Sequence, residues 1–181
     1  MIKSLQELFQ ESFQVFYEPI TELSYDDSNK QSLCISAEKM YNYDRIIKHL
    51  FKYGEAIATS DAVYFKDKKI IFVEFKNGFI NERERKNLRL KAIEGAYIGL
   101  YTIIQRAQLP YSFEDIHRQR KEYYIVYNPI KNKKTRTNKI KHHLSAVSTR
   151  FGLERYQGIF FEKIHTISAK TFIDKLESIL K

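Results

Sequence analysis

Two apolar stretches separated by a short polar turn determine the fold of the middle of the chain. They are SDAVYF at positions 60–65 and IIFVEFKNG at positions 70–78. Both are rich in β-branched and aromatic residues, which is typical of β-strands. The charged segment 66–69 between them is short enough for a tight hairpin. The two stretches therefore predict a pair of antiparallel strands.

The register of this hairpin places two carboxylates opposite each other. Whether the loop holds two residues (67–68) or four (66–69), Asp61 falls opposite Glu74. Directly opposed residues have Cβ atoms about 4.5–5.5 Å apart, so their charges repel unless a cation lies between them. A divalent cation with oxygen ligands suits that gap. Lys76 follows on the same face, about 7 Å further along the strand, where it can hold a water molecule or face the charge of a phosphate.

This pattern resembles the core motif of the PD-(D/E)XK nuclease superfamily. Asp61 is followed by twelve residues and then by Glu74-Phe75-Lys76, while Ser60 stands where the family usually has proline. The resemblance implies that Asp61 and Glu74 bind Mg²⁺ or Mn²⁺ as the cofactor. It also implies that the Phe75 backbone carbonyl adds a metal ligand and that Lys76 is the catalytic lysine.

A surface ion pair between Glu74 and Lys76 is the alternative interpretation, and such pairs contribute little to stability. However, Glu74 lies within the segment 70–75, which is otherwise apolar. A carboxylate buried there requires a charged or hydrogen-bonding partner. This argument favours the metal site.

A helix before the hairpin is predicted from Ser36, as its N-cap, to about Lys52. In the resembled family such a helix often contributes a further acidic residue to the metal site. Asp44 lies beside the apolar stripe of this helix and is the favoured candidate. An ion pair with Lys48, four residues later, is an equally weighted alternative for Asp44.

Two other acidic residues remain open as the further metal ligand. Glu38 falls on the polar side of the predicted helix, and Glu55 begins a predicted strand over 55–59.

A long helix is predicted over roughly residues 81–106, and its two halves differ in character. The second half carries small residues at helical spacing, including Gly95 and Gly99, which let a helix lie close on a sheet despite costing about 1 kcal/mol each. The first half is basic and follows the Glu-x-Lys strand, so it is a candidate phosphate-binding surface. Its candidate residues are Arg83, Arg85 and Lys86.

A second basic segment lies further along, where no acidic residue occurs between Glu122 and Glu154. This segment has little apolar character, which predicts an exposed loop that contacts nucleic acid. The candidate nucleic-acid-binding residues in it are Lys131, Lys133, Lys134, Arg136, Lys139 and Lys141.

The composition bounds the protein class. The chain has 181 residues, 43% of them hydrophobic, which suits one domain with a substantial core. The formal net charge of +9 predicts a polyanionic partner. The single Cys34 excludes an internal disulfide. Neither a signal peptide nor a membrane span is recognisable, so we expect a cytoplasmic protein without a membrane partner.

The fold class expected is α/β (α+β), with a mixed sheet flanked by helices. The resemblance covers roughly residues 37–128 and implies a restriction-endonuclease-like αβββαβ core. A strand over 156–161 and a helix over 169–180 extend that core, and 129–181 form a C-terminal extension containing the basic segment. The whole chain, 1–181, is expected to be a single nuclease-like domain.

The expected function is metal-dependent hydrolysis of phosphodiester bonds. DNA is favoured over RNA because most of the resembled superfamily acts on DNA, and an endonuclease is favoured over an exonuclease. Two alternatives stay open: an RNA endonuclease and a nucleic-acid-binding module without catalysis on the same fold. The sequence leaves a homodimer open as well.

Overall fold

A six-stranded mixed sheet forms the centre of the computed structural model, which describes residues 3–51, 57–66, 69–132 and 151–180. The strand order is β1-β4-β5-β6-β7-β8. The first three pairings are antiparallel, and β6–β7 and β7–β8 are parallel. The expected mixed α/β class is therefore confirmed. The strands are β1 (Tyr17–Pro19), β4 (Lys39–Asn42), β5 (Ala62–Lys66), β6 (Lys69–Lys76), β7 (Arg120–Tyr127) and β8 (Lys163–Ser168).

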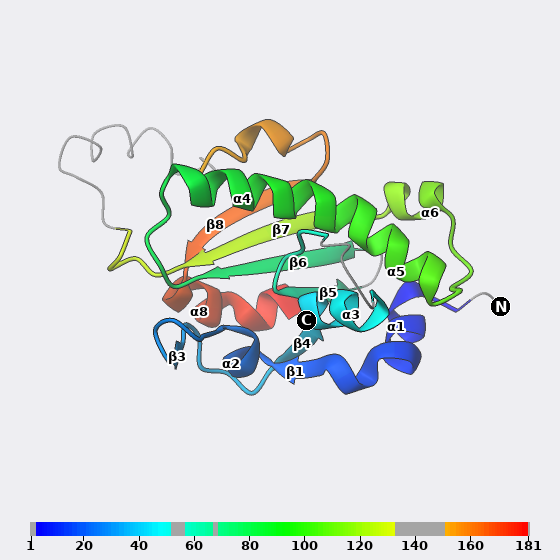
Figure 1. The fold of residues 1–181 in the computed structure, drawn as a ribbon, viewed down its shortest axis with the longest axis horizontal. Helices are drawn as coiled ribbons and strands as arrows, with labels where there is room; N and C mark the ends of the chain where they lie inside the picture. The colour runs from blue at the N-terminus through cyan, green and yellow to red at the C-terminus, as the bar shows by residue number, and fades with distance from the viewer. Residues whose placement is uncertain (1–2, 52–56, 67–68, 133–150, 181) are drawn as a thin grey trace.

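Helices cover both faces of this sheet (Figure 1). One apolar cluster joins α1, α3, the long central helix and α6 to one face, and a second joins α2 and α8 to the other. Alternate residues of β6 enter the two clusters, Phe72 the first and Val73 the second. The helices are α1 (Leu5–Phe13), α2 (Ile20–Leu23), α3 (Tyr43–Leu50), α4 (Glu82–Ile93), α5 (Leu100–Arg106), α6 (Phe113–Arg118) and α8 (Ala169–Leu180).

Smaller elements complete the described chain. Short 3₁₀ turns, η1 (Gln14–Phe16) and η4 (Glu154–Tyr156), follow α1 and precede β8. A separate two-stranded ribbon consists of β2 (Tyr25–Asp26) and β3 (Gln31–Ser32). Within the described ranges, no helix is long and apolar enough to cross a lipid bilayer.

The predicted hairpin is confirmed as β5 and β6. Lys66 pairs with Lys69, so the loop has two residues, and the ladder ends at Ala62 opposite Val73. Asp61, the residue before that last pair, is therefore in register with Glu74. The alternation of side chains along β5 and β6 places both carboxylates on the face covered by α4.

The helix predicted from Ser36 is wrong in its first part. Lys39–Asn42 is strand β4, and the helix begins at Tyr43 with Asn42 as its N-cap, whose Oδ1 accepts a hydrogen bond from the Arg45 N–H at 3.0 Å. Met40 and Tyr41 are both buried, but in the two clusters on opposite faces of the sheet. Burial on alternating sides is the period of a strand and outweighs the helical spacing of Met40, Tyr43 and Ile47.

Two predicted strands are also corrected. The described part of the first, residues 57–59, has no regular structure. The segment 156–161 is a compact turn in which Gly158 has a φ of +79° and the Phe160 N–H donates to the Tyr156 carbonyl at 2.9 Å. The C-terminal strand is instead β8, and the final helix over 169–180 is confirmed.

The predicted long helix is continuous over α4 and α5, joined by a π-helical segment, η2 (Glu94–Gly99). Its small residues face the irregular chain that leads into β5. A Cβ added at Gly95 would lie 3.1 Å from Thr59 Cα, and one at Gly99 would lie 2.9 Å from the Tyr43 hydroxyl. That hydroxyl donates to the Gly95 carbonyl. The glycines therefore permit close packing, but against the segment 57–60 and Tyr43 rather than against the sheet itself.

We expect Gly99→Ala to lower the free energy of unfolding by about 1–3 kcal/mol, because the new methyl group forces the buried Tyr43 ring to shift. Urea unfolding measures the change. Gly78→Ala is the matched control, since no atom of the described residues lies within 4 Å of the added Cβ. Equal stability of the two variants would contradict the close packing at η2.

A buried ionic cluster joins β6, β7 and β8 near Lys69, at the opposite end of β6 from Glu74. The Glu122 carboxylate lies 3.6 Å from His165 Nε2, accepts from Lys69 Nζ at 2.8 Å and accepts from the Tyr124 hydroxyl at 3.1 Å. Contacts with His165, Lys69 and Tyr124 outweigh burial and lower the pKa of Glu122 to about 2. The folded state therefore favours the ionised form of this carboxylate.

Because the folded pKa of Glu122 is lowered, its contribution to stability is complete above the unfolded pKa and is lost as the pH falls from about 5 towards 2. We expect Glu122→Gln to cost about 3 kcal/mol at neutral pH and progressively less over that interval. Urea unfolding at several pH values measures the difference, with the exposed Glu154→Gln as the control. A cost that stays constant from pH 6 to pH 2 would contradict the prediction.

Candidate functional site

The three residues that the sequence singled out meet on one face of the sheet. Glu74 and Lys76 project from β6, and Lys76 Nζ lies 3.1 Å from Glu74 Oε1. Asp61 lies just before β5, and its Oδ2 accepts a hydrogen bond from the Phe75 N–H at 2.6 Å. Glu74 is fully buried. The strand register thus brings Asp61, Glu74 and Lys76 together as predicted.

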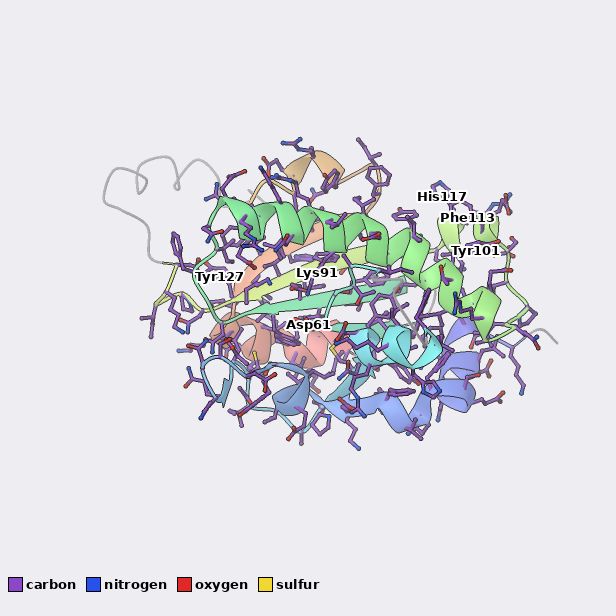
Figure 2. The ribbon with its side chains drawn as sticks, in the orientation of Figure 1. Asp61, Lys91, Tyr101, Phe113, His117 and Tyr127 are labelled. Carbon is purple, nitrogen blue, oxygen red and sulfur yellow. The ribbon has the colours of Figure 1, made fainter. Side chains whose placement is uncertain are left out.

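A fourth residue, which sequence reasoning missed, lies between the two carboxylates. Lys91 of α4 donates to both oxygens of Glu74, at 2.8 and 3.0 Å, and its Nζ lies 3.5 Å from Asp61 Oδ1. Figure 2 shows Lys91 reaching down from α4 above Asp61. The signal available in the sequence was helical spacing. Lys91 stands three residues after Leu88 and four before Gly95, both buried, so it lies on the inward face of the helix.

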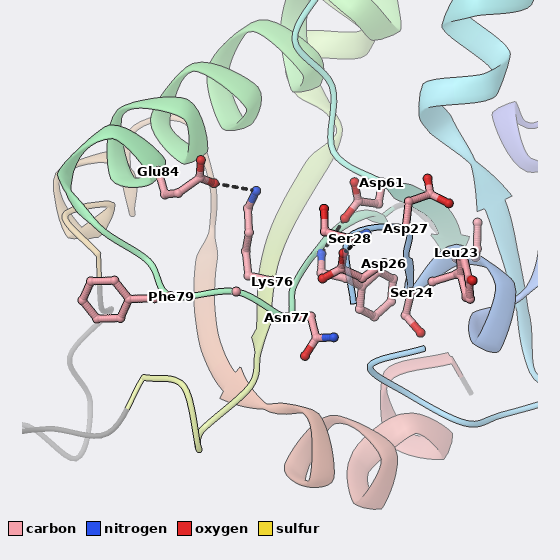
Figure 3. A pocket seen from close by; sticks show the side chains of 13 residues that line it. Leu23, Ser24, Asp26, Asp27, Ser28, Asp61, Lys76, Asn77, Phe79 and Glu84 are labelled. Carbon is pink, nitrogen blue, oxygen red and sulfur yellow. Dashed lines mark hydrogen bonds and ion pairs between the residues drawn. The ribbon is translucent and has the colours of Figure 1, made fainter. Parts of the chain in front are cut away.

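Glu84, also missed, anchors the predicted catalytic lysine from the first turn of α4. Lys76 Nζ lies 3.0 Å from Glu84 Oε2 (Figure 3). This hydrogen bond is the main cause that lowers the pKa of Glu84. Lys76 is thus held between one carboxylate of the sheet and one of the helix.

Burial and the charges of neighbouring groups together shift the pKa values of Asp61 and Lys91. Burial, and then the neighbouring Glu74 charge, raise the pKa of Asp61 above its ordinary value. Burial alone would lower the pKa of Lys91, but the charges of Glu74 and Asp61 outweigh it and raise that pKa. The Asp61 carboxylate therefore depends on a nearby cation to remain ionised.

The backbone of Phe75 contributes to the same corner. Successive peptide groups of a strand point to opposite sides, and the Lys76 carbonyl accepts from the Asn128 N–H on the β7 side at 3.0 Å. The Phe75 N–H and carbonyl consequently point to the β5 side, beyond the last ladder pair of Ala62 with Val73. The Phe75 carbonyl oxygen is therefore directed towards the side on which Asp61 lies, which suits the ligand role expected for it.

A cleft of about 450 Å³ opens beside these residues, between the end of β6 and the β2–β3 ribbon (Figure 3). Lys76 and Asp61 reach it from the sheet, and Asp26 and Asp27 reach it from the ribbon. The Asp26 carboxylate already accepts hydrogen bonds from the N–H groups of Ser28 and Asn29. The lining residues are Leu23, Ser24, Tyr25, Asp26, Asp27, Ser28, Asp61, Phe75, Lys76, Asn77, Gly78, Phe79 and Glu84.

The acidic candidates from the segment before the hairpin do not join the site. Asp44 forms an ion pair with Lys48, the alternative that the sequence left open, and its side chain is 44% exposed. Glu38 is exposed, and Glu55 lies outside the described residues. In the described ranges, no group of three His, Cys, Asp or Glu side chains is placed to hold a metal. The described acidic residues thus offer the pair Asp61 and Glu74, without Asp44.

The basic candidates are only partly described. Arg83, Arg85 and Lys86 are exposed on the first turns of α4. Lys131 is exposed and donates to the Asn29 side chain, which follows β2. It therefore lies near the ribbon that borders the cleft. Lys133, Lys134, Arg136, Lys139 and Lys141 lie outside the described residues.

Comparison of the chain with protein-family models, with curated proteins and with solved structures found no match. The functional interpretation consequently depends on the chemistry of the site itself.

The donor set fits a hard divalent cation. Two carboxylates and a backbone carbonyl supply the oxygen ligands that Mg²⁺ and Mn²⁺ prefer. The Lys91 ammonium already lies where a cation would bridge Asp61 and Glu74, so the electrostatics of this position favour positive charge. In the segment just before Asp61, Thr59 Oγ1 and Ser60 Oγ are buried without a hydrogen-bond partner in the described part of the chain.

We expect Glu74→Gln to destabilise the metal-free protein by about 3 kcal/mol, because two partly buried lysines lose their shared carboxylate. Urea unfolding at neutral pH in EDTA measures the effect. Glu82→Gln, in the first turn of α4, makes the same change at a side chain that is 67% exposed, and it should cost less than about 1 kcal/mol. Equal costs would show that Glu74 contributes no more than a surface charge.

Proposed function

We propose that this protein is a metal-dependent nuclease that hydrolyses phosphodiester bonds, with a restriction-endonuclease-like core. The observation that carries the proposal is the convergence of Asp61, Glu74 and Lys76 beside an open cleft. The order of the elements supports the core assignment. Strands β4, β5 and β6 are antiparallel neighbours in the sheet, with α3 between β4 and β5 in the chain. The connection from β6 to the parallel strand β7 then runs through α4, η2, α5 and α6.

In this proposal Asp61, Glu74 and the Phe75 carbonyl hold Mg²⁺ or Mn²⁺. Such an ion, when bound, lowers the pKa of a coordinated water and stabilises the negative charge that develops on the phosphate. The protein supplies the rest. The Phe75 N–H fixes the Asp61 carboxylate, and burial within the sheet fixes the Glu74 carboxylate.

Lys76 has the role of a positioned cation. Its ammonium lies between Glu74 and Glu84, with its stem on the rigid strand β6, and it lines the cleft. From there it can donate a hydrogen bond to a phosphate oxygen or to the attacking water. Because Glu84 holds it in place, little reorganisation is required when charge develops on the phosphate.

The proposed substrate is nucleic acid, and DNA is preferred by the resemblance of the Asp-Glu-x-Lys pattern. The net charge of +9 and the basic segment that begins at Lys131 suit a polyanion. RNA is tested in the same experiment as DNA.

One observation favours a second candidate function, a nucleic-acid-binding module without catalysis. Lys91 neutralises the carboxylate pair without a metal, as a purely structural ion pair would. This alternative predicts binding that weakens steeply with salt but persists in EDTA.

The test is incubation of the protein with supercoiled plasmid, single-stranded DNA and RNA, each with Mn²⁺, Mg²⁺ or EDTA. We expect cleavage only with metal, and we expect Lys76→Ala to reduce its rate by about 100-fold or more, because a positioned charge at the phosphate is lost. Lys170→Ala, on the exposed start of α8, is the control and should cleave at the wild-type rate.

Full activity in Lys76→Ala would refute the assignment of this residue. Salt-sensitive binding without any cleavage in the presence of metal would support the binding module instead. If only the DNA samples or only the RNA sample is cleaved, that result identifies the class of nucleic acid on which the protein acts.

A further inference from the structure

We infer that Lys91 is a displaceable cation that holds the metal position of the site until a divalent ion replaces it. The inference rests on the proposed function and adds a role for a residue outside the Asp-Glu-x-Lys pattern. Lys91 is a positioning residue in this view, because it acts on the two carboxylates rather than on the substrate.

The geometry makes the ammonium and the metal mutually exclusive. Lys91 Nζ lies 2.8 and 3.0 Å from the two Glu74 oxygens and 3.5 Å from Asp61 Oδ1. An ion bridging the same carboxylates sits about 2.0–2.1 Å from their oxygens. Both positions lie in the same gap, so the ammonium must leave when the ion enters.

The charges of the site give the reason for the exchange. Three carboxylates, Asp61, Glu74 and Glu84, face two ammonium groups, Lys76 and Lys91. A divalent ion together with Lys76 balances the three carboxylates, whereas retention of Lys91 would leave one surplus positive charge in a partly buried site. Displacement of Lys91 therefore gives the neutral arrangement, which costs least in a medium of low dielectric constant.

The two lysines differ in how they are held, which determines which of them moves. Lys76 keeps a second partner, Glu84, when the metal takes over the carboxylate pair. Among the described residues, the ion pairs of Lys91 are with Asp61 and Glu74, the two groups that the metal would take. Its side chain is 27% exposed and has a flexible four-carbon stem, so it can turn towards solvent without any change in the backbone.

The consequence is a site in which Asp61 and Glu74 already share a cation before the metal arrives, at the expense of metal affinity. When a competing group occupies the binding-competent position for nine-tenths of the time, the apparent dissociation constant rises about tenfold. Removal of the ammonium should restore the intrinsic affinity.

The decisive experiment compares Mn²⁺ binding by wild type and Lys91→Gln, measured by electron paramagnetic resonance of free Mn²⁺ without nucleic acid. We expect Lys91→Gln to bind Mn²⁺ about tenfold more tightly than wild type. Lys175→Gln removes the same charge from the exposed face of α8, on the other side of the sheet, and should bind as wild type does. Equal or weaker binding by Lys91→Gln would overturn the inference.

A second measurement uses the wild-type chain, in case Lys91→Gln does not fold. The ¹⁵N-labelled lysine ammonium signal that is absent from Lys91→Arg belongs to Lys91. Titration with diamagnetic Mg²⁺ should move this signal towards that of a solvated lysine, and an unchanged signal at saturating Mg²⁺ would overturn the inference.

The two proposals fail in different ways. If wild type binds Mn²⁺ and cleaves nucleic acid but Lys91→Gln binds no more tightly, only the displacement by metal is refuted. If neither wild type nor Lys91→Gln binds Mn²⁺, the metal site is refuted, and the displaceable role of Lys91 is refuted with it.

Discussion

The burial of one charged side chain, Glu74, constrains much of the rest of the structure. It lies in an apolar strand, fully covered, and an uncompensated carboxylate there would cost several kcal/mol. Two lysines meet this requirement, Lys76 from the same strand and Lys91 from the helix that crosses above it. The sheet and α4 are consequently joined by charge as well as by apolar packing. A fold that must hold these partners in place also maintains a ready arrangement of carboxylates and cations.

The long helix is fixed in position by the chain that precedes β5. The Glu94 carboxylate accepts a hydrogen bond from the Ala58 N–H at 2.9 Å, and the small residues of η2 allow the same segment to approach. This segment continues directly into Asp61. The contacts between η2 and the segment 57–60 therefore fix the position of Lys91 relative to Asp61. Such close control suits a site whose groups must be placed to within about 0.5 Å.

How much could be predicted from the sequence varied with the range of the interactions involved. The register of Asp61 against Glu74 was predictable because hairpin loops of two and of four residues give the same pairing. Lys91 was not predicted, since its role depends on how a helix crosses a strand, which local patterns do not specify. Strand β8, KIHTIS, was missed because it mixes polar and apolar residues and gains its place by pairing with β7. The start of α3 was misplaced because β4 fits a helical spacing and an alternating one equally well.

The π-helical turn has a consequence for how this chain can change in length. A π turn contains more residues than an α turn, so η2 shifts the phase of α5 relative to α4. Inward-facing residues lie on both sides of η2, Leu88 and Lys91 before it and Leu100 and Ile103 after it. Because a π turn holds about one residue more than an α turn, η2 can absorb the loss of a single residue by converting to α-helix, which leaves the two halves in phase. Loss of a residue from α4 or α5 has no such outlet. It would rotate one half by about 100° against the other and separate the candidate site from the core that supports it.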